Sequence, residues 1–166
     1  MQEKLLPAIF GWEQVQQQVI RLLDGAAVLG LPVLGTEQYR KGLGPTVPEV
    51  MQALRGAALV EKLTFSAWRS AEVRSAIKAS GAKDALLCGI EAHVCVCQTC
   101  LDLLDAGYRV FVVQDATSSR TAENHRLGIE RMRQAGAIIV STEMLLFELL
   151  KQAGTQEFKQ ILGLVK

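Results

Sequence analysis

Apolar residues recur three and four positions apart in six stretches of the chain, which is the spacing of an amphipathic helix. The predicted helices cover residues 13–29, 70–80, 93–107, 122–135, 142–152 and 156–164. Short apolar runs predict strands at residues 31–35, 57–60, 85–88, 109–114 and 137–140. Residues 42–48 contain two Gly and two Pro, which predict an irregular loop.

Strands and helices alternate along the chain, an order typical of the α/β class with parallel strands and right-handed crossovers. We therefore predict a three-layer, Rossmann-like fold in which a mostly parallel sheet carries helices on both faces. The 166 residues show no internal repeat and no interdomain linker, so a single domain over residues 1–166 is expected.

Polar segments follow four of the predicted strands directly, at residues 36–39, 62–65, 89–95 and 115–120. Ligands of open parallel sheets bind beyond the carboxyl ends of the strands, and all four segments lie at that edge. We therefore expect the functional site there. Within the last segment, Asp115 and Arg120 are expected to form a salt bridge that braces their own loop.

Cys95 is the main candidate for chemistry at this edge. It lies where the apolar strand at residues 85–88 gives way to a helix that begins near His93. The first turn of a helix has unpaired N–H groups and the positive end of the helix dipole. A thiol there is more easily ionised, and the same N–H groups can hold an oxyanion. The alternative interpretation is a buried, inert cysteine.

Composition and charge restrict the function classes. A net charge of +1 and an apolar share of 49% indicate a globular protein without a nucleic-acid-binding surface. No apolar run approaches the roughly 20 residues that span a bilayer, and the first residues lack the order of a signal peptide. Four cysteines crowd between Cys88 and Cys100, where pairing would be strained. We expect reduced thiols and a cytoplasmic location.

The residues near Cys95 allow three other interpretations: a Cys–His pair, a metal site and a redox-responsive cluster. His93 lies two positions away, or about 200° around a helix, so no direct contact with Cys95 is expected. Cys95, Cys97 and Cys100 follow one another along a single helix, whereas structural zinc pairs its Cys ligands across turns. No metal or other cofactor is therefore expected. A redox-responsive role for the cysteine cluster stays open.

Three blocks of sequence carry a resemblance to a known family: GIEAHVCVCQTCLDLLDAGYRVFVVQDATSSR at residues 89–120, TEQYRKGLGPTVPEV at 36–50 and VEKLTFSAW at 60–68. They resemble the isochorismatase-like cysteine hydrolases, a family that includes the nicotinamidases. The resemblance continues through the C-terminal helices and so covers nearly the whole chain. It is strongest to the subgroup that carries the TEQY and GLGPTVPE motifs.

The resemblance implies a set of site residues. It places the nucleophile on Cys95 and the catalytic lysine on Lys62, whose ammonium group would stabilise a thiolate. It also implies a cis peptide bond between Ile90 and Glu91, and an oxyanion hole made by the N–H groups of Glu91 and Cys95. The residues expected to line the substrate pocket are Gln38, Tyr39 and Phe65.

The sequence departs from the family at one important place. The family's catalytic Asp directly precedes a Met-Gln pair that is matched here by Met1 and Gln2, and the first strand that carries this Asp has no counterpart. In the family that strand lies centrally, so we expect a gap between the strands at residues 31–35 and 85–88. We expect residues preceding Met1 to supply the strand and the Asp; otherwise a neighbouring subunit or a rearranged strand pairing would fill the gap.

The main hypothesis is a hydrolase that acts on a small amide or related acyl compound through a cysteine nucleophile and a thioester intermediate. The family's nicotinamidases carry an Asp/His metal site, and no His precedes His93, which argues against that specific activity. The alternative is a catalytically inactive binding or scaffold protein. A homo-oligomer is expected, as in related proteins, with Leu43, Val47 and Val50 packed against another subunit. The other expected partner is a small-molecule substrate, without nucleic acid or membrane.

Overall fold

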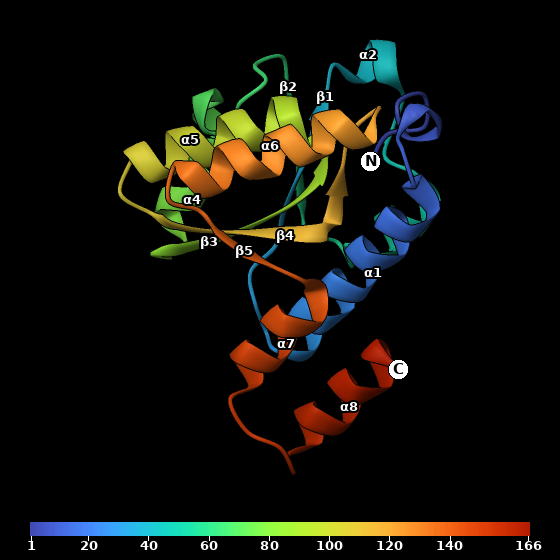
Figure 1. The fold of residues 1–166 in the computed structure, drawn as a ribbon, viewed down its shortest axis with the longest axis vertical. Coiled ribbons are helices and arrows are strands. Elements are labelled where there is room, and N and C mark those ends of the chain that lie inside the picture. The colour runs from blue at the N-terminus through green and yellow to red at the C-terminus, as the bar shows by residue number, and fades with distance from the viewer.

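A computed structural model describes all residues 1–166 and has the predicted α/β class (Figure 1). The helices are α1 (Trp12–Val28), α2 (Arg40–Leu43), α3 (Pro48–Ala53), α4 (Ala71–Ala79), α5 (Cys97–Asp105), α6 (Ala122–Gln134), α7 (Thr142–Leu150) and α8 (Gln156–Val165). The strands are β1 (Leu34–Gln38), β2 (Ala58–Lys62), β3 (Asp84–Ile90), β4 (Arg109–Ser118) and β5 (Ile138–Val140). Short 3₁₀ helices lie at Leu6–Ala8 and Ala67–Arg69, and a π-helical turn at Ala92–Val96 leads into α5. No helix combines the length and the apolar character needed to cross a membrane.

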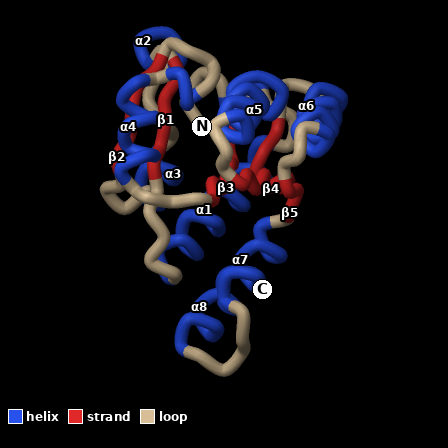
Figure 2. Tube along the Cα trace, turned by 90° about the vertical axis from the view of Figure 1, so that its left-hand side faces the viewer, coloured by secondary structure: helices blue, strands red, loops and turns tan.

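The strands form two separate parallel sheets (Figure 2). One sheet contains β1 and β2, and the other has the order β3-β4-β5. Helices α1 and α7 pack on one side of β4, whereas α5 and α6 pack on the other side (Figure 1). The arrangement therefore has the three layers that the sequence predicts.

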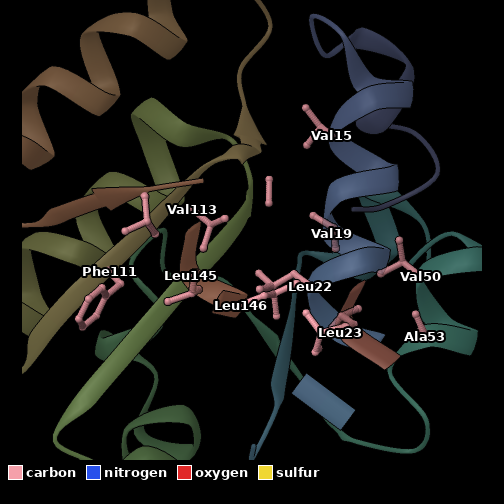
Figure 3. Close-up of a cluster of buried hydrophobic side chains, with 13 residues drawn as sticks. Val15, Val19, Leu22, Leu23, Val50, Ala53, Phe111, Val113, Leu145 and Leu146 are labelled. Carbon is pink, nitrogen blue, oxygen red and sulfur yellow. The ribbon is translucent and has the colours of Figure 1, made fainter. Parts of the chain in front are cut away.

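Strands β3 and β4 are apolar on both faces because each face packs into a different hydrophobic core. Alternate side chains of β4 take opposite sides: Phe111 and Val113 join the core beside α1, and Val110 and Val112 join the core beside α5 and α6. A strand covered on both faces reads as a continuous apolar run, which explains the sequence pattern. The first core also receives side chains from α3 and α7, as Figure 3 shows for Val50, Ala53, Leu145 and Leu146.

Strands β1 and β3 do not pair with each other, so the expected gap is present and each strand keeps one unpaired edge. From Ala85 to Ile90, every residue of β3 is only partly buried. The Gln2 side chain covers the end of the open edge of β1. Its Oε1 accepts from the Gln38 N–H at 2.8 Å and its Nε2 donates to the Gln38 carbonyl at 3.0 Å.

Two local predictions have the wrong bounds. The strand expected at residues 31–35 begins three positions later, at Leu34, and includes the polar residues up to Gln38. Pro32, which has no N–H to donate, lies just before it. The loop expected at residues 42–48 is confirmed for residues 44–47, but α2 extends to Leu43 and α3 begins at Pro48. Pro48 occupies the first turn of α3, where a missing N–H costs nothing.

The apolar residues of this region also have a different role from the expected one. Val50 is 5% exposed and belongs to the core beside α1, and Val47 packs against the same core. Val50 is therefore covered by its own chain and does not require a second subunit, whereas Leu43 and Val47 are partly exposed.

Candidate active site

Lys62 is the last residue of β2, and its charged group is held inside the protein. The residue is only 6% exposed. Its ammonium donates three hydrogen bonds, to Gln38 Oε1 at 2.7 Å and to the carbonyls of Thr64 at 3.0 Å and Phe65 at 2.9 Å. These bonds fix the position of the ammonium group.

The Lys62 ammonium and the Cys95 thiol lie close enough to change each other's ionisation. Burial lowers the pKa of Lys62, and Cys95 works against that change. Burial also raises the pKa of Cys95, and the Glu91 carboxylate adds to the increase, whereas Lys62 opposes it. The expectation of an easily ionised thiol is therefore wrong, because loss of solvation outweighs the effect of the nearby cation.

Cys95 lies inside the π-helical turn and not in an ordinary first helical turn. The Glu91 carbonyl accepts from the N–H groups of Val94 and Val96, both at 3.2 Å, and the second bond spans five residues. Such turns frequently occur at functional sites. The peptide bond between Ile90 and Glu91 is cis, as the resemblance implies. No protein group accepts a hydrogen bond from the Glu91 N–H.

The Glu91 side chain is paired with Arg120, which corrects the predicted salt bridge between Asp115 and Arg120. Oxygen Oε2 of Glu91 accepts from the Arg120 backbone N–H at 3.2 Å and from its Nε at 3.0 Å. Asp115 instead accepts from the N–H and hydroxyl groups of Thr142, at 2.8 and 2.9 Å. The Asp115 carboxylate in β4 therefore binds the first residue of α7, and Arg120 reaches the Cys95 turn instead.

The two histidines are bound to hydroxyl groups. His93 Nδ1 lies 2.9 Å from Ser119 Oγ, so His93 has a partner other than Cys95, as expected. His125 Nε2 lies 3.2 Å from the Thr117 hydroxyl. Nowhere in the chain do three or more His, Cys, Asp or Glu side chains gather in a way that could hold a metal ion.

The three expected pocket residues have different surroundings. Gln38 joins the site, since it accepts from Lys62 and its amide donates to the Leu63 carbonyl at 2.8 Å. Tyr39 and Phe65 are 48% and 54% exposed, and Phe65 contacts Lys62 through its carbonyl. Elsewhere, a surface hollow of about 510 Å³ is lined by Gln114 and residues of α6, and Cys95 is not part of it.

Thr99 is a site residue that the sequence analysis missed. Its hydroxyl donates to the Cys95 carbonyl at 2.6 Å and accepts from the Ala67 N–H at 2.9 Å. It therefore ties the segment after β2 to the turn that carries Cys95. A Thr four positions after Cys95 could have suggested the first bond, because helical Thr hydroxyls often reach the carbonyl four residues back.

Parallel strands with helices on both faces define a three-layer protein of the α/β class. Residues 1–144 match the isochorismatase domain family, and the chain therefore belongs to the isochorismatase family. Among its relatives is the secreted isochorismatase effector Isc1 of Phytophthora sojae, 46% identical over 149 residues that make up 87% of this chain and 71% of the relative.

Solved structures show the same fold. The MAR1 ribonuclease of Caenorhabditis elegans superposes with a TM-score of 0.93 at 36% identity, over 99% of this chain and 84% of that chain. YcaC of Pseudomonas aeruginosa, solved with covalent acrylamide, has a TM-score of 0.91 at 29% identity over 98% and 84% of the two chains. Its Escherichia coli counterpart, described as an octameric hydrolase of unknown specificity, has a TM-score of 0.91 at 26% identity over 98% and 83%.

Proposed function

We propose that the protein is a hydrolase of a small amide or related acyl compound, with Cys95 as its nucleophile. The observation that carries the proposal is the buried Lys62 ammonium beside the Cys95 thiol. Burying a charged lysine costs free energy unless the ammonium has hydrogen-bond or ionic partners. A thiolate is such a partner, and an adjacent cation is the usual means of stabilising it.

The reaction would take place in two steps. The Cys95 thiol gives its proton to a water molecule and the sulfur attacks the carbonyl carbon, forming a C–S bond while the π electrons of the carbonyl move to its oxygen, which becomes negative. The N–H groups of Glu91 and Cys95 stabilise that oxygen; the Glu91 N–H is available for this role because it has no protein acceptor. The carbonyl then re-forms as the C–N bond breaks, and the leaving nitrogen takes up the proton that the thiol released. Water attacks the thioester carbon, the C–S bond breaks, and a proton of that water returns to the sulfur, which releases the acid and restores the Cys95 thiol.

One comparison supports hydrolysis in general, and a second supports a covalent step. Family membership makes hydrolysis the general activity to expect. The YcaC structure from Pseudomonas aeruginosa contains covalent acrylamide, an electrophile that reacts with nucleophilic side chains such as thiols. The Caenorhabditis elegans neighbour is named a ribonuclease, but the net charge of +1 gives no general attraction for RNA.

The test is ammonia release from a panel of small primary amides, combined with intact-mass detection of an acyl adduct. The variants are Cys95→Ala and Lys62→Met, with Lys83→Met as the control because Lys83 is an exposed lysine outside the site. We expect both site variants to lose activity and the control to keep it. Full activity of Cys95→Ala would overturn the proposal. Release of nucleotides from single-stranded RNA would indicate a ribonuclease, and binding without turnover would indicate the scaffold alternative.

We also propose a homo-oligomer in a reducing compartment. The octameric description of the Escherichia coli neighbour supports self-association, and four free cysteines are consistent with a cytoplasmic location. Light scattering at micromolar concentration tests the first point. A monomer would contradict it.

A further inference from the structure

Ser119 and Arg120 lie in the loop that follows β4, and both form hydrogen bonds to residues at the start of the turn that contains Cys95. Arg120 binds the Glu91 carboxylate with its backbone N–H and its side chain. Ser119 is fully buried, and its hydroxyl accepts from the His93 N–H at 3.4 Å. The loop therefore contacts the residues on both sides of Ala92, at the point where β3 becomes the π-helical turn.

The exposure of the two charged partners is unequal. The Glu91 side chain is 12% exposed, whereas the Arg120 side chain is 60% exposed. Only Oε2 of Glu91 has a hydrogen-bond partner, and it accepts both hydrogen bonds from Arg120. A largely enclosed carboxylate thus depends on an exposed arginine for its orientation and for compensation of its charge.

The position of Glu91 affects Cys95 in two ways. Its carbonyl accepts the hydrogen bonds of Val94 and Val96, which enclose Cys95 in the turn. Its carboxylate is one of the charged groups that act on the thiol: Glu91 raises the pKa of Cys95, whereas Lys62 lowers it. A change at Glu91 is therefore transmitted both to the backbone and to the charge balance at the sulfur.

We propose that Arg120 is a positioning residue for the Cys95 reaction, acting through Glu91. The inference rests on the proposed function for its kinetic consequence, but the state of the thiol can be measured without any substrate. Arg120 keeps the Glu91 carboxylate and the Glu91 N–H in one orientation and partly neutralises the charge that opposes the thiolate.

The test is a double-mutant cycle on the full chain with Arg120→Ala, Glu91→Gln and their combination. Two readouts are used: the pH profile of Cys95 alkylation by iodoacetamide, and kcat and KM on whichever amide is hydrolysed. Arg120→Lys restores the charge and serves as the rescue. Arg126→Ala is the matched control, because Arg126 is also an exposed arginine in ion pairs, with Glu123 and Glu130 on α6.

We expect opposite effects from the two single changes. Arg120→Ala leaves the Glu91 charge uncompensated, so the inflection point in the pH profile of Cys95 alkylation moves to higher pH. The kcat for amide hydrolysis falls about tenfold with little change in KM. Glu91→Gln removes the charge and moves the inflection to lower pH. In the double variant the effect of Arg120→Ala disappears, because its route of action is gone. Arg120→Lys returns the inflection toward that of the unchanged protein.

The inference is overturned if Arg120→Ala behaves like Arg126→Ala, or if its effect on alkylation is equally large in the Glu91→Gln background. A merely structural role would lower the melting temperature without opposite shifts in the two pH profiles. If the alkylation cycle behaves as expected while no amide is hydrolysed, the positioning role stands and the proposed function fails. If an amide is hydrolysed but the Arg120 and Glu91 variants are alkylated like the unchanged protein, the proposed function stands and the positioning role fails.

Discussion

Gln38 and Lys62 are register partners at the ends of β1 and β2, and the Gln38 side-chain oxygen accepts from the Lys62 ammonium at 2.7 Å. Parallel pairing places both side chains on the same face of the small sheet and at the same edge. The backbone of Gln38 is in turn bound at both its N–H and its carbonyl by the Gln2 side chain. The position of the ammonium group is thus set by the ends of two strands and by the segment that precedes them.

Gln38→Leu should disturb this arrangement without changing any charge. Lys62 would lose one of three acceptors, and leaving a buried donor unsatisfied costs about 1–3 kcal/mol. We expect a lower melting temperature and slower alkylation of Cys95 at neutral pH, because the ammonium would no longer be fixed beside the thiol. Gln17→Leu is the control, since Gln17 is an exposed glutamine on α1. Equal alkylation rates in the two variants would contradict the role given to Gln38.

The four thiols should differ in reactivity. Burial raises the pKa of Cys88 to about 11 and that of Cys100 to about 12, and it raises the pKa of Cys97 as well. Cys95 is the thiol on which Lys62 acts, and the ammonium favours its charged form. We therefore expect iodoacetamide to label Cys95 first, at a rate that rises with pH.

Lys62→Met is expected to move the Cys95 labelling profile to higher pH, because the cation that lowers the pKa of the thiol is removed. At neutral pH the labelling rate should fall, while labelling of Cys88 and Cys100 stays slow. Peptide mass spectrometry over a pH series measures each site separately. Uniform labelling of all four cysteines would show that Cys95 is not distinguished by its surroundings.

The helices and strands were largely predictable because most of them bury one apolar stripe or one apolar run. The predicted helix at residues 13–29 corresponds to α1, and the predicted strand at residues 85–88 lies within β3. The exception is β1, whose residues Thr36 to Gln38 are polar although they pair with β2. A strand whose side chains bind partners, instead of packing in a core, lacks the apolar pattern on which such predictions depend.

The site was less predictable because its contacts join residues far apart in sequence. Glu91 and Arg120 are separated by 29 positions, and nothing local distinguishes this pair from Asp115 with Arg120. The thiol pKa was also misjudged. The sequence showed the helix start and the lysine, but the extent of burial around Cys95, which decides the direction, depends on the packed structure.

Glu37 and Glu61 are register partners that should respond very differently to removal of their carboxylates. Glu37 is 2% exposed and accepts from the buried Thr46 N–H at 2.6 Å, whereas Glu61 is exposed. We expect Glu37→Leu to lower the free energy of unfolding by about 1–3 kcal/mol, since the Thr46 N–H would lose its partner. Glu61→Leu should have a smaller effect, because the Arg40 N–H that donates to Glu61 at 2.9 Å is exposed and can bind water instead. Urea denaturation of the two variants compares them, and similar midpoints would show that the Thr46 bond is unimportant.

Gly128 and Gly163 offer a paired test of how closely α6 must approach the Cys95 turn. A Cβ atom at Gly128 would lie 3.0 Å from the His93 N and Cα atoms, which are backbone and cannot move aside without shifting the turn. A Cβ at Gly163 in α8 would meet nothing within 4 Å. Gly163→Ala should therefore stabilise the protein by about 0.4–1 kcal/mol through the unfolded state. Gly128→Ala should destabilise it by about 1–3 kcal/mol and also slow Cys95 alkylation, because the strain falls on the turn that holds the thiol. Thermal melting and alkylation of both variants separate the two effects. If Gly128→Ala melts as high as Gly163→Ala and labels at the unchanged rate, α6 does not constrain the nucleophile.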